Sequence, residues 1–170
     1  MPPLAPPPIA VDQIRDRVHI NPYHAVVKRK VLASFRGLTA HDPGPALALM
    51  ATDVRYTFEG EHALGGTRVS RAGVQKWFTR LLRLLPGQFA IREVRVTGWP
   101  WSTRVVTRFE HHVVPPEGPA YWGPGVQIVD LCWGKATQIH TYVDTAKLVE
   151  TLTAMAAAGQ AEAMAPPILE

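Results

Sequence analysis

The segment SRAGVQKWFTRLLRLLPG, residues 70–87, carries the strongest periodic pattern in this chain of 170 residues. Ser70 is a suitable N-cap, and Pro86-Gly87 ends the pattern. The apolar side chains between them recur at the spacing of one helix face and are Val74, Trp77, Phe78, Leu81, Leu82 and Leu85. The segment therefore predicts a helix over about 70–85 that buries one face in a core.

Four segments with strand character follow this helix, at about 88–98, 103–114, 121–133 and 135–143. Short turns that contain proline or glycine separate them. Parallel strands need long crossover connections, whereas antiparallel strands can be joined by tight turns. The short turns therefore predict a mostly antiparallel sheet.

Helical and strand patterns also flank this central part of the chain. Asn21 and Asp144 are suitable N-caps for a first and a last helix. The further elements that we expect are three helices, over about 22–41, 45–51 and 144–157, and one strand around 54–58. Helices, a strand, a long helix and then a run of strands are typical of an α+β fold. We expect a cone-shaped α+β barrel, in which a curved, mostly antiparallel sheet is wrapped by three main helices around an apolar pocket.

Both ends of the chain differ from this part. Residues 1–21 are rich in proline, which disfavours a long helix, and they predict a flexible arm. The apolar spacing within 11–18 hints at one short helix in that arm. Residues 159–170 predict a loose tail, which leaves 22–158 as a single domain.

The overall composition is that of an ordinary globular protein, with 46% hydrophobic and 19% charged residues. The formal net charge is +4, but the basic residues are scattered, and the one tight run, 28–30, lies in a helical pattern. We therefore expect no nucleic-acid partner. No apolar stretch is long enough to span a bilayer, so we expect no membrane partner. The single Cys132 excludes an internal disulfide and fits a reducing, cytoplasmic location.

Several local strings resemble the nuclear transport factor 2-like superfamily, and within it the SnoaL-like proteins. These strings are His41-Asp-Pro, Ala51-Thr-Asp-Val-Arg-Tyr-Thr-Phe, Gly65-Gly-Thr-Arg before the Trp77-Phe78 helix, Trp133-Gly-Lys and His140-Thr-Tyr-Val-Asp. The resemblance spans about 22–155 and implies a SnoaL-like domain over 22–158. Proteins of this superfamily include polyketide cyclases, ketosteroid isomerases, epoxide hydrolases of the limonene-epoxide type and domains with no chemistry at all.

The resemblance also implies roles for particular residues. Enzymes of this fold generally hold one carboxylate base in an apolar cone, where burial raises its pKa, opposite a donor that stabilises oxyanion charge. Arg108 and Glu110 resemble the Arg-x-Asp element of the epoxide hydrolases, and Tyr56 falls where those enzymes keep a water-positioning tyrosine. Glu110 would then be the base, with Arg108 and Tyr56 as orienting donors. Two positions depart from the pattern, because Phe58 replaces an asparagine and Thr141 replaces the general-base aspartate.

Which face of strand 103–114 looks into the pocket stays open from the sequence. Arg108 and Glu110 are two residues apart, so they share one face and can contact each other. The alternate residues are more apolar, and that face would instead bring His111 into the pocket and leave the charged pair on the surface. His111 and His140 are therefore the alternative acid–base candidates.

The favoured function is a cofactor-independent acid–base enzyme that cyclises, isomerises or opens an epoxide in a small hydrophobic, oxygen-bearing molecule. The alternative is a noncatalytic ligand-binding or assembly domain with the same pocket. We expect the pocket to be lined by Phe58, Trp77, Phe78, Leu81 and Thr141.

Two further expectations concern metals and partners. Neighbouring residues of a strand point to opposite faces, so His111 and His112 cannot hold one metal ion together, and we expect no metal site. Large side chains on a sheet face that no helix covers, such as Trp101, Trp133 and Tyr142, predict a homodimer through that face.

Overall fold

The computed structural model describes residues 21–114 and 120–170, so the predicted N-terminal arm lies outside the described residues apart from Asn21. The elements in chain order are α1 (Pro22–Thr39), α2 (Gly44–Ala48), β1 (Met50–Phe58), β2 (Gly66–Arg68), α3 (Arg71–Leu84), β3 (Gly87–Trp99), β4 (Ser102–Val113), β5 (Tyr121–Cys132), β6 (Lys135–Val143), α4 (Thr145–Ala157) and the short 3-10 helix η2 (Ala161–Met164). The predicted helices and strands agree with these bounds to within a few residues.

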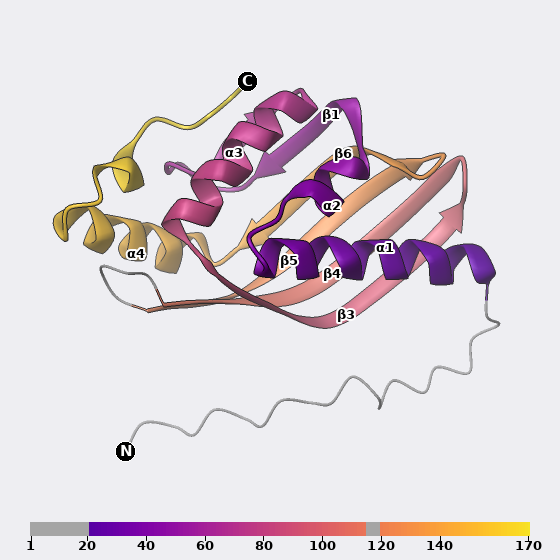
Figure 1. Ribbon diagram of the computed structural model, residues 1–170, viewed down its shortest axis with the longest axis horizontal. Coiled ribbons are helices and arrows are strands. Elements are labelled where there is room, and N and C mark those ends of the chain that lie inside the picture. Colours follow the sequence, from indigo (N-terminus) through magenta and orange to yellow (C-terminus); the bar gives the residue numbers. More distant parts are fainter. Residues whose placement is uncertain (1–20, 115–119) are drawn as a thin grey trace, which may run out of the picture.

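The strands form one sheet of six, in the order β2-β1-β6-β5-β4-β3. Neighbouring strands are antiparallel except for β1 and β6, which run parallel and are connected through α3 and the four other strands. The long central strands cross the molecule behind α1 in Figure 1. The predicted curved, mostly antiparallel α+β architecture is confirmed.

Three helices cover one face of this sheet, with α1 across the long strands, α3 beside β1, and α4 at the end of the cone (Figure 1). Each of them begins at its predicted N-cap. The side chains of Asn21, Ser70 and Asp144 accept hydrogen bonds from backbone N–H groups two or three residues further on, at 3.0, 3.0 and 3.1 Å. These bonds satisfy donors that a helix start leaves unpaired, so local sequence fixes where each helix begins.

Two parts of the chain differ from expectation. The glycine-bearing loop before α3 contains β2, a short edge strand antiparallel to β1. The end of the chain is not a loose tail, and that prediction is wrong. Ala163 is buried, Glu162 pairs with Arg83 of α3 at 2.5 Å, and the Ile168 carbonyl accepts a hydrogen bond from Arg68 at 2.6 Å. Charged side chains on β2 and α3 thus provide partners that the composition of the tail does not reveal.

No helix in the described part of the chain is both long and apolar enough to cross a bilayer. Within residues 21–114 and 120–170, no group of three or more histidine, cysteine or acidic side chains is arranged to hold a metal ion.

Candidate functional site

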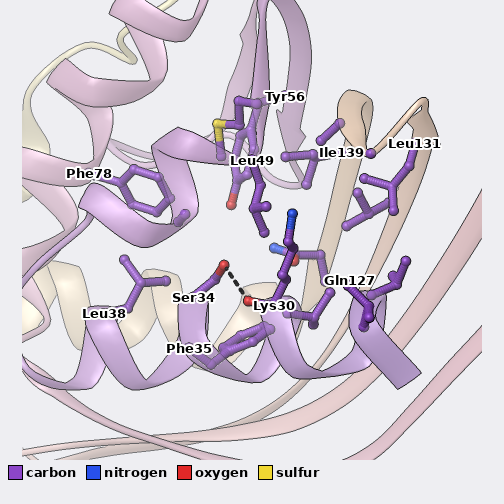
Figure 2. A pocket seen from close by; sticks show the side chains of 18 of the residues that line it. Lys30, Ser34, Phe35, Leu38, Leu49, Tyr56, Phe78, Gln127, Leu131 and Ile139 are labelled. Atoms are coloured by element: carbon purple, nitrogen blue, oxygen red, sulfur yellow. Dashed lines mark hydrogen bonds between the residues drawn. The ribbon is translucent and has the colours of Figure 1, made fainter. Parts of the chain in front are cut away.

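The space between α1 and the sheet contains an apolar cavity of about 120 Å³. Its walls come from α1, from α3 and from the inward residues of β1, β5 and β6. Figure 2 shows Leu131 and Ile139 of the sheet facing Phe35 and Leu38 of α1 across this space. Every second residue of a strand points to the same face of the sheet. On the face toward α1 these residues are mostly apolar, so the sheet side of the cavity is mostly hydrocarbon.

Lys30 is the one charged side chain among the described residues that line this cavity. No Asp or Glu is among them. The Lys30 side chain extends from α1 into the space enclosed by the labelled residues in Figure 2. All ion pairs among the described residues lie elsewhere and leave Lys30 without a carboxylate partner. The cavity therefore has a positively charged edge and an apolar interior.

A smaller cavity of about 40 Å³ adjoins the main one, and Leu148 of α4 is among its lining residues. We call this space the apex. It shares five lining residues with the main cavity, namely Phe35, Leu38, Tyr56, Phe78 and Gln127. The five residues expected in the pocket all line the apex, and they are Phe58, Trp77, Phe78, Leu81 and Thr141.

Three polar side chains form a row across neighbouring strands on the inward face of the sheet. Thr107, Gln127 and Thr141 lie directly opposite one another on β4, β5 and β6. Gln127 Nε2 donates to Thr141 Oγ1 at 3.1 Å, and the Tyr56 hydroxyl lies 3.3 Å from the same oxygen. Burial raises the pKa of Tyr56 to about 12, so its phenol stays protonated at neutral pH. Thr107 Oγ1 is buried and has no hydrogen-bond partner among the described residues.

His111 also lines the apex, from the inward face of β4. Its ring stacks on Phe89 with 4.1 Å between centroids, and only 6% of the residue is exposed. Burial lowers the pKa of His111 from 6.5 to about 4, with the charge of His112 as a smaller cause, while a hydrogen bond to the Leu85 backbone opposes the shift. The imidazole is therefore neutral at pH 7. Its Nε2 is buried without a hydrogen-bond partner among the described residues.

Arg108 and Glu110 lie on the opposite, outer face of β4, so the interpretation that brings them into the pocket is wrong. They also do not pair with each other. Arg108 contacts Glu93 at 3.3 Å, and Glu110 accepts a hydrogen bond from Arg92 at 2.7 Å. That bond holds the pKa of the Glu110 carboxyl below its usual range. The physical reason is strand parity, because the more apolar alternate residues occupy the buried face.

His140 likewise lies on the outer face of the sheet, from β6. It contacts the Glu59 carboxylate and stacks on Tyr142 with 4.3 Å between ring centroids. Neither cavity is lined by this histidine. Of the sequence candidates, Tyr56 and His111 are brought together at the apex, whereas Arg108, Glu110 and His140 are not.

Sequence reasoning missed Lys30 and Gln127. The register of the central strands places Gln127 opposite Thr141, and this is the signal that would have found it. Lys30 lies in a basic run whose other members, Lys28 and Arg29, do not line the cavity, and its spacing from Val27 and Val31 puts it at the edge of the buried stripe of α1.

Comparison with solved structures gives a consistent fold. TerC, in a crystal structure with polyporic acid, is 26% identical, with a TM-score of 0.64 and coverage of 74% of this chain and 96% of that one. An NTF2-like protein from Burkholderia pseudomallei is 24% identical, with a TM-score of 0.66 and coverage of 75% and 98%. A protein of ketosteroid isomerase-like fold from Catenulispora acidiphila, in complex with trimethylamine, is 17% identical, with a TM-score of 0.56 and coverage of 75% and 92%.

The search of curated proteins finds no match. The family model for the SnoaL-like domain, in contrast, matches residues 31–139, which is more than half of the chain. This segment runs from the middle of α1 to β6 and contains most residues of both cavities. The chain therefore belongs to the SnoaL-like domain family.

Proposed function

We propose that this domain encloses one small, mostly apolar molecule that carries oxygen. The observation that supports this most directly is the apolar cavity of about 120 Å³ between α1 and the sheet, because protein interiors are usually packed without such voids. An apolar cavity of roughly 150 Å³ is enough to bind benzene in another protein, so a single ring is an appropriate size here. The polar groups around the cavity are few, which fits recognition of one or two oxygens on a hydrocarbon body.

The charge of the lining residues indicates the chemical class of the ligand. Lys30 at the edge of the cavity favours an electron-rich or acidic oxygen on the ligand, and no lining carboxylate among the described residues opposes it. TerC has been co-crystallised with polyporic acid, which supports an acidic organic compound as the ligand.

Cofactor-independent acid–base catalysis on the same ligand is the second candidate. The specific observation that favours it is that a neutral imidazole with an unpartnered Nε2, from His111, and a protonated phenol, from Tyr56, line one apex. A base and a donor on two sides of a substrate are the minimum set for proton transfer in a cyclisation or isomerisation. Glu110 is not proposed as the base, because its carboxylate lies outside both cavities.

The test of ligand binding uses p-xylene, a single ring without oxygen, and detects it by calorimetry and by chemical-shift changes. We expect wild-type protein to bind it and Val31→Trp, which fills the main cavity, to lose binding. Leu32→Trp is the matched control on the same helix, because Leu32 does not line the cavity. Absence of binding to wild-type protein, or equal binding by both variants, would contradict the proposal.

A further inference from the structure

The apex contains a hydrogen-bond acceptor for which the described protein provides no donor. His111 is 94% buried, and its Nε2 has no partner among the described residues. Nε2 is unpartnered and the Leu85 N–H already donates to the Leu81 carbonyl, so we infer that Nδ1 donates to the Leu85 backbone and carries the proton of the neutral ring. Nε2 therefore presents a lone pair and not an N–H.

A buried acceptor without a donor costs free energy, and native proteins rarely keep one unless water or a ligand satisfies it. A rotation of the ring out of its plane would break the stack on Phe89, which has an interplanar angle of 7°. A half-turn that keeps the stack would move Nδ1 away from the Leu85 backbone. The apex beside it, at about 40 Å³, has room for one hydroxyl group or one water. The body of a ligand would remain in the main cavity, with which the apex shares its walls.

The surroundings of Nε2 limit which donor fits. A ligand ammonium would need a nearby anion, and none of the described residues that line the apex is acidic. An uncharged O–H group has no such requirement. Aromatic side chains line the apex around His111, and they include Phe35, Phe58, Phe78 and Phe109. The faces and edges of aromatic rings pack best against another flat ring.

We propose that the ligand is an aromatic hydroxyl compound of the phenol type, whose O–H group enters the apex and donates to Nε2 of His111. His111 is thus a specificity-determining residue of the cavity. This inference rests on the proposed function, because it names the chemical class of the molecule that the cavity encloses. It also predicts the orientation of the bound ligand, with its hydroxyl group at the apex and its other end toward Lys30.

The test compares p-cresol with p-xylene, which have nearly the same shape and differ by a hydroxyl in place of a methyl group. The measured quantity is the ratio of their dissociation constants, in wild-type protein and in His111→Phe. The phenylalanine keeps the ring stack and removes Nε2. The solvation of the two free probes is the same in both experiments. The change in the ratio of dissociation constants therefore measures the contact between the ligand hydroxyl and Nε2 of His111.

We expect His111→Phe to lower the preference for p-cresol by about tenfold, the size of one buried hydrogen bond. The matched control is His112→Phe, whose ring lies on the outer face and whose Nε2 accepts from Trp122 Nε1 at 2.9 Å. This control should keep the wild-type preference. If His111→Phe leaves the ratio unchanged, the apex holds a water and the inference is overturned.

A second measurement on wild-type protein does not depend on the folding of any variant. Nitrogen NMR of the His111 ring should show a shift of the Nε2 resonance with p-cresol and none with p-xylene. Equal shifts, or none, with both bound probes would also overturn the inference. If p-xylene itself fails to bind, the proposed function fails, which is a separate and distinguishable result.

Discussion

The burial of His111 predicts a specific dependence of stability on pH. In the unfolded chain the imidazole titrates near 6.5, whereas burial lowers its pKa to about 4 in the folded protein. The folded state then binds fewer protons than the unfolded state between these values, so stability present above pH 6.5 is lost as the pH falls toward 4. For a shift of this size, linkage gives a loss of about 2 kcal/mol between pH 7 and pH 5 from this one residue.

Urea unfolding followed by circular dichroism at pH 7 and pH 5 measures this loss. His111→Phe removes the titrating group, so its loss of unfolding free energy over that interval should be smaller than the wild-type loss by about 2 kcal/mol. His112→Phe is the matched control, because that ring is exposed on the outer face, and it should keep most of the wild-type loss. Parallel pH dependence of wild-type protein and His111→Phe would refute the argument from burial.

Four further predictions follow from the placement of other side chains. Tyr56→Phe removes a hydroxyl that lies 3.3 Å from Thr141 Oγ1, and should lower the unfolding free energy by about 1 kcal/mol in urea titrations. Glu110→Gln should leave p-cresol binding unchanged and stability within about 1 kcal/mol, since its ion pair lies on the outer face; a loss of binding would contradict that placement. Lys30→Met should weaken binding of 4-methylbenzoate relative to p-xylene in calorimetry, whereas Lys28→Met should not. Homodimerisation through the open face of the sheet stays a prediction, and sedimentation of a monomer at micromolar concentration would contradict it.

The sequence predicts the elements of this fold well because each boundary has a local physical cause. Asn21, Ser70 and Asp144 accept the hydrogen bonds that begin the three long helices, and these caps are visible in the sequence. Pro86 and Gly87 end the central helical pattern for equally local reasons. The docking of the C-terminal segment depends instead on distant partners such as Arg68, which no local pattern indicates.

The candidate site was harder to predict, because it depends on which face of a strand is buried. The alternation along β4 favours a buried Phe109 and His111, whereas the family resemblance favours an inward Arg108 and Glu110. The structure follows the hydrophobic alternation, since burying two charged side chains costs more than burying one neutral imidazole. Gln127 gains its place only from pairing between strands, so it required the register of the sheet.

The central claim is that a small aromatic molecule lies inside the cone, between α1 and the sheet. The most direct measurement is a set of intermolecular NOEs between bound p-cresol and assigned methyl groups of the protein. The account predicts NOEs to Val31, Leu131 and Ile139, which line the main cavity. NOEs only to Val106 and Ile128, which pair on the outer face of the sheet, would contradict it.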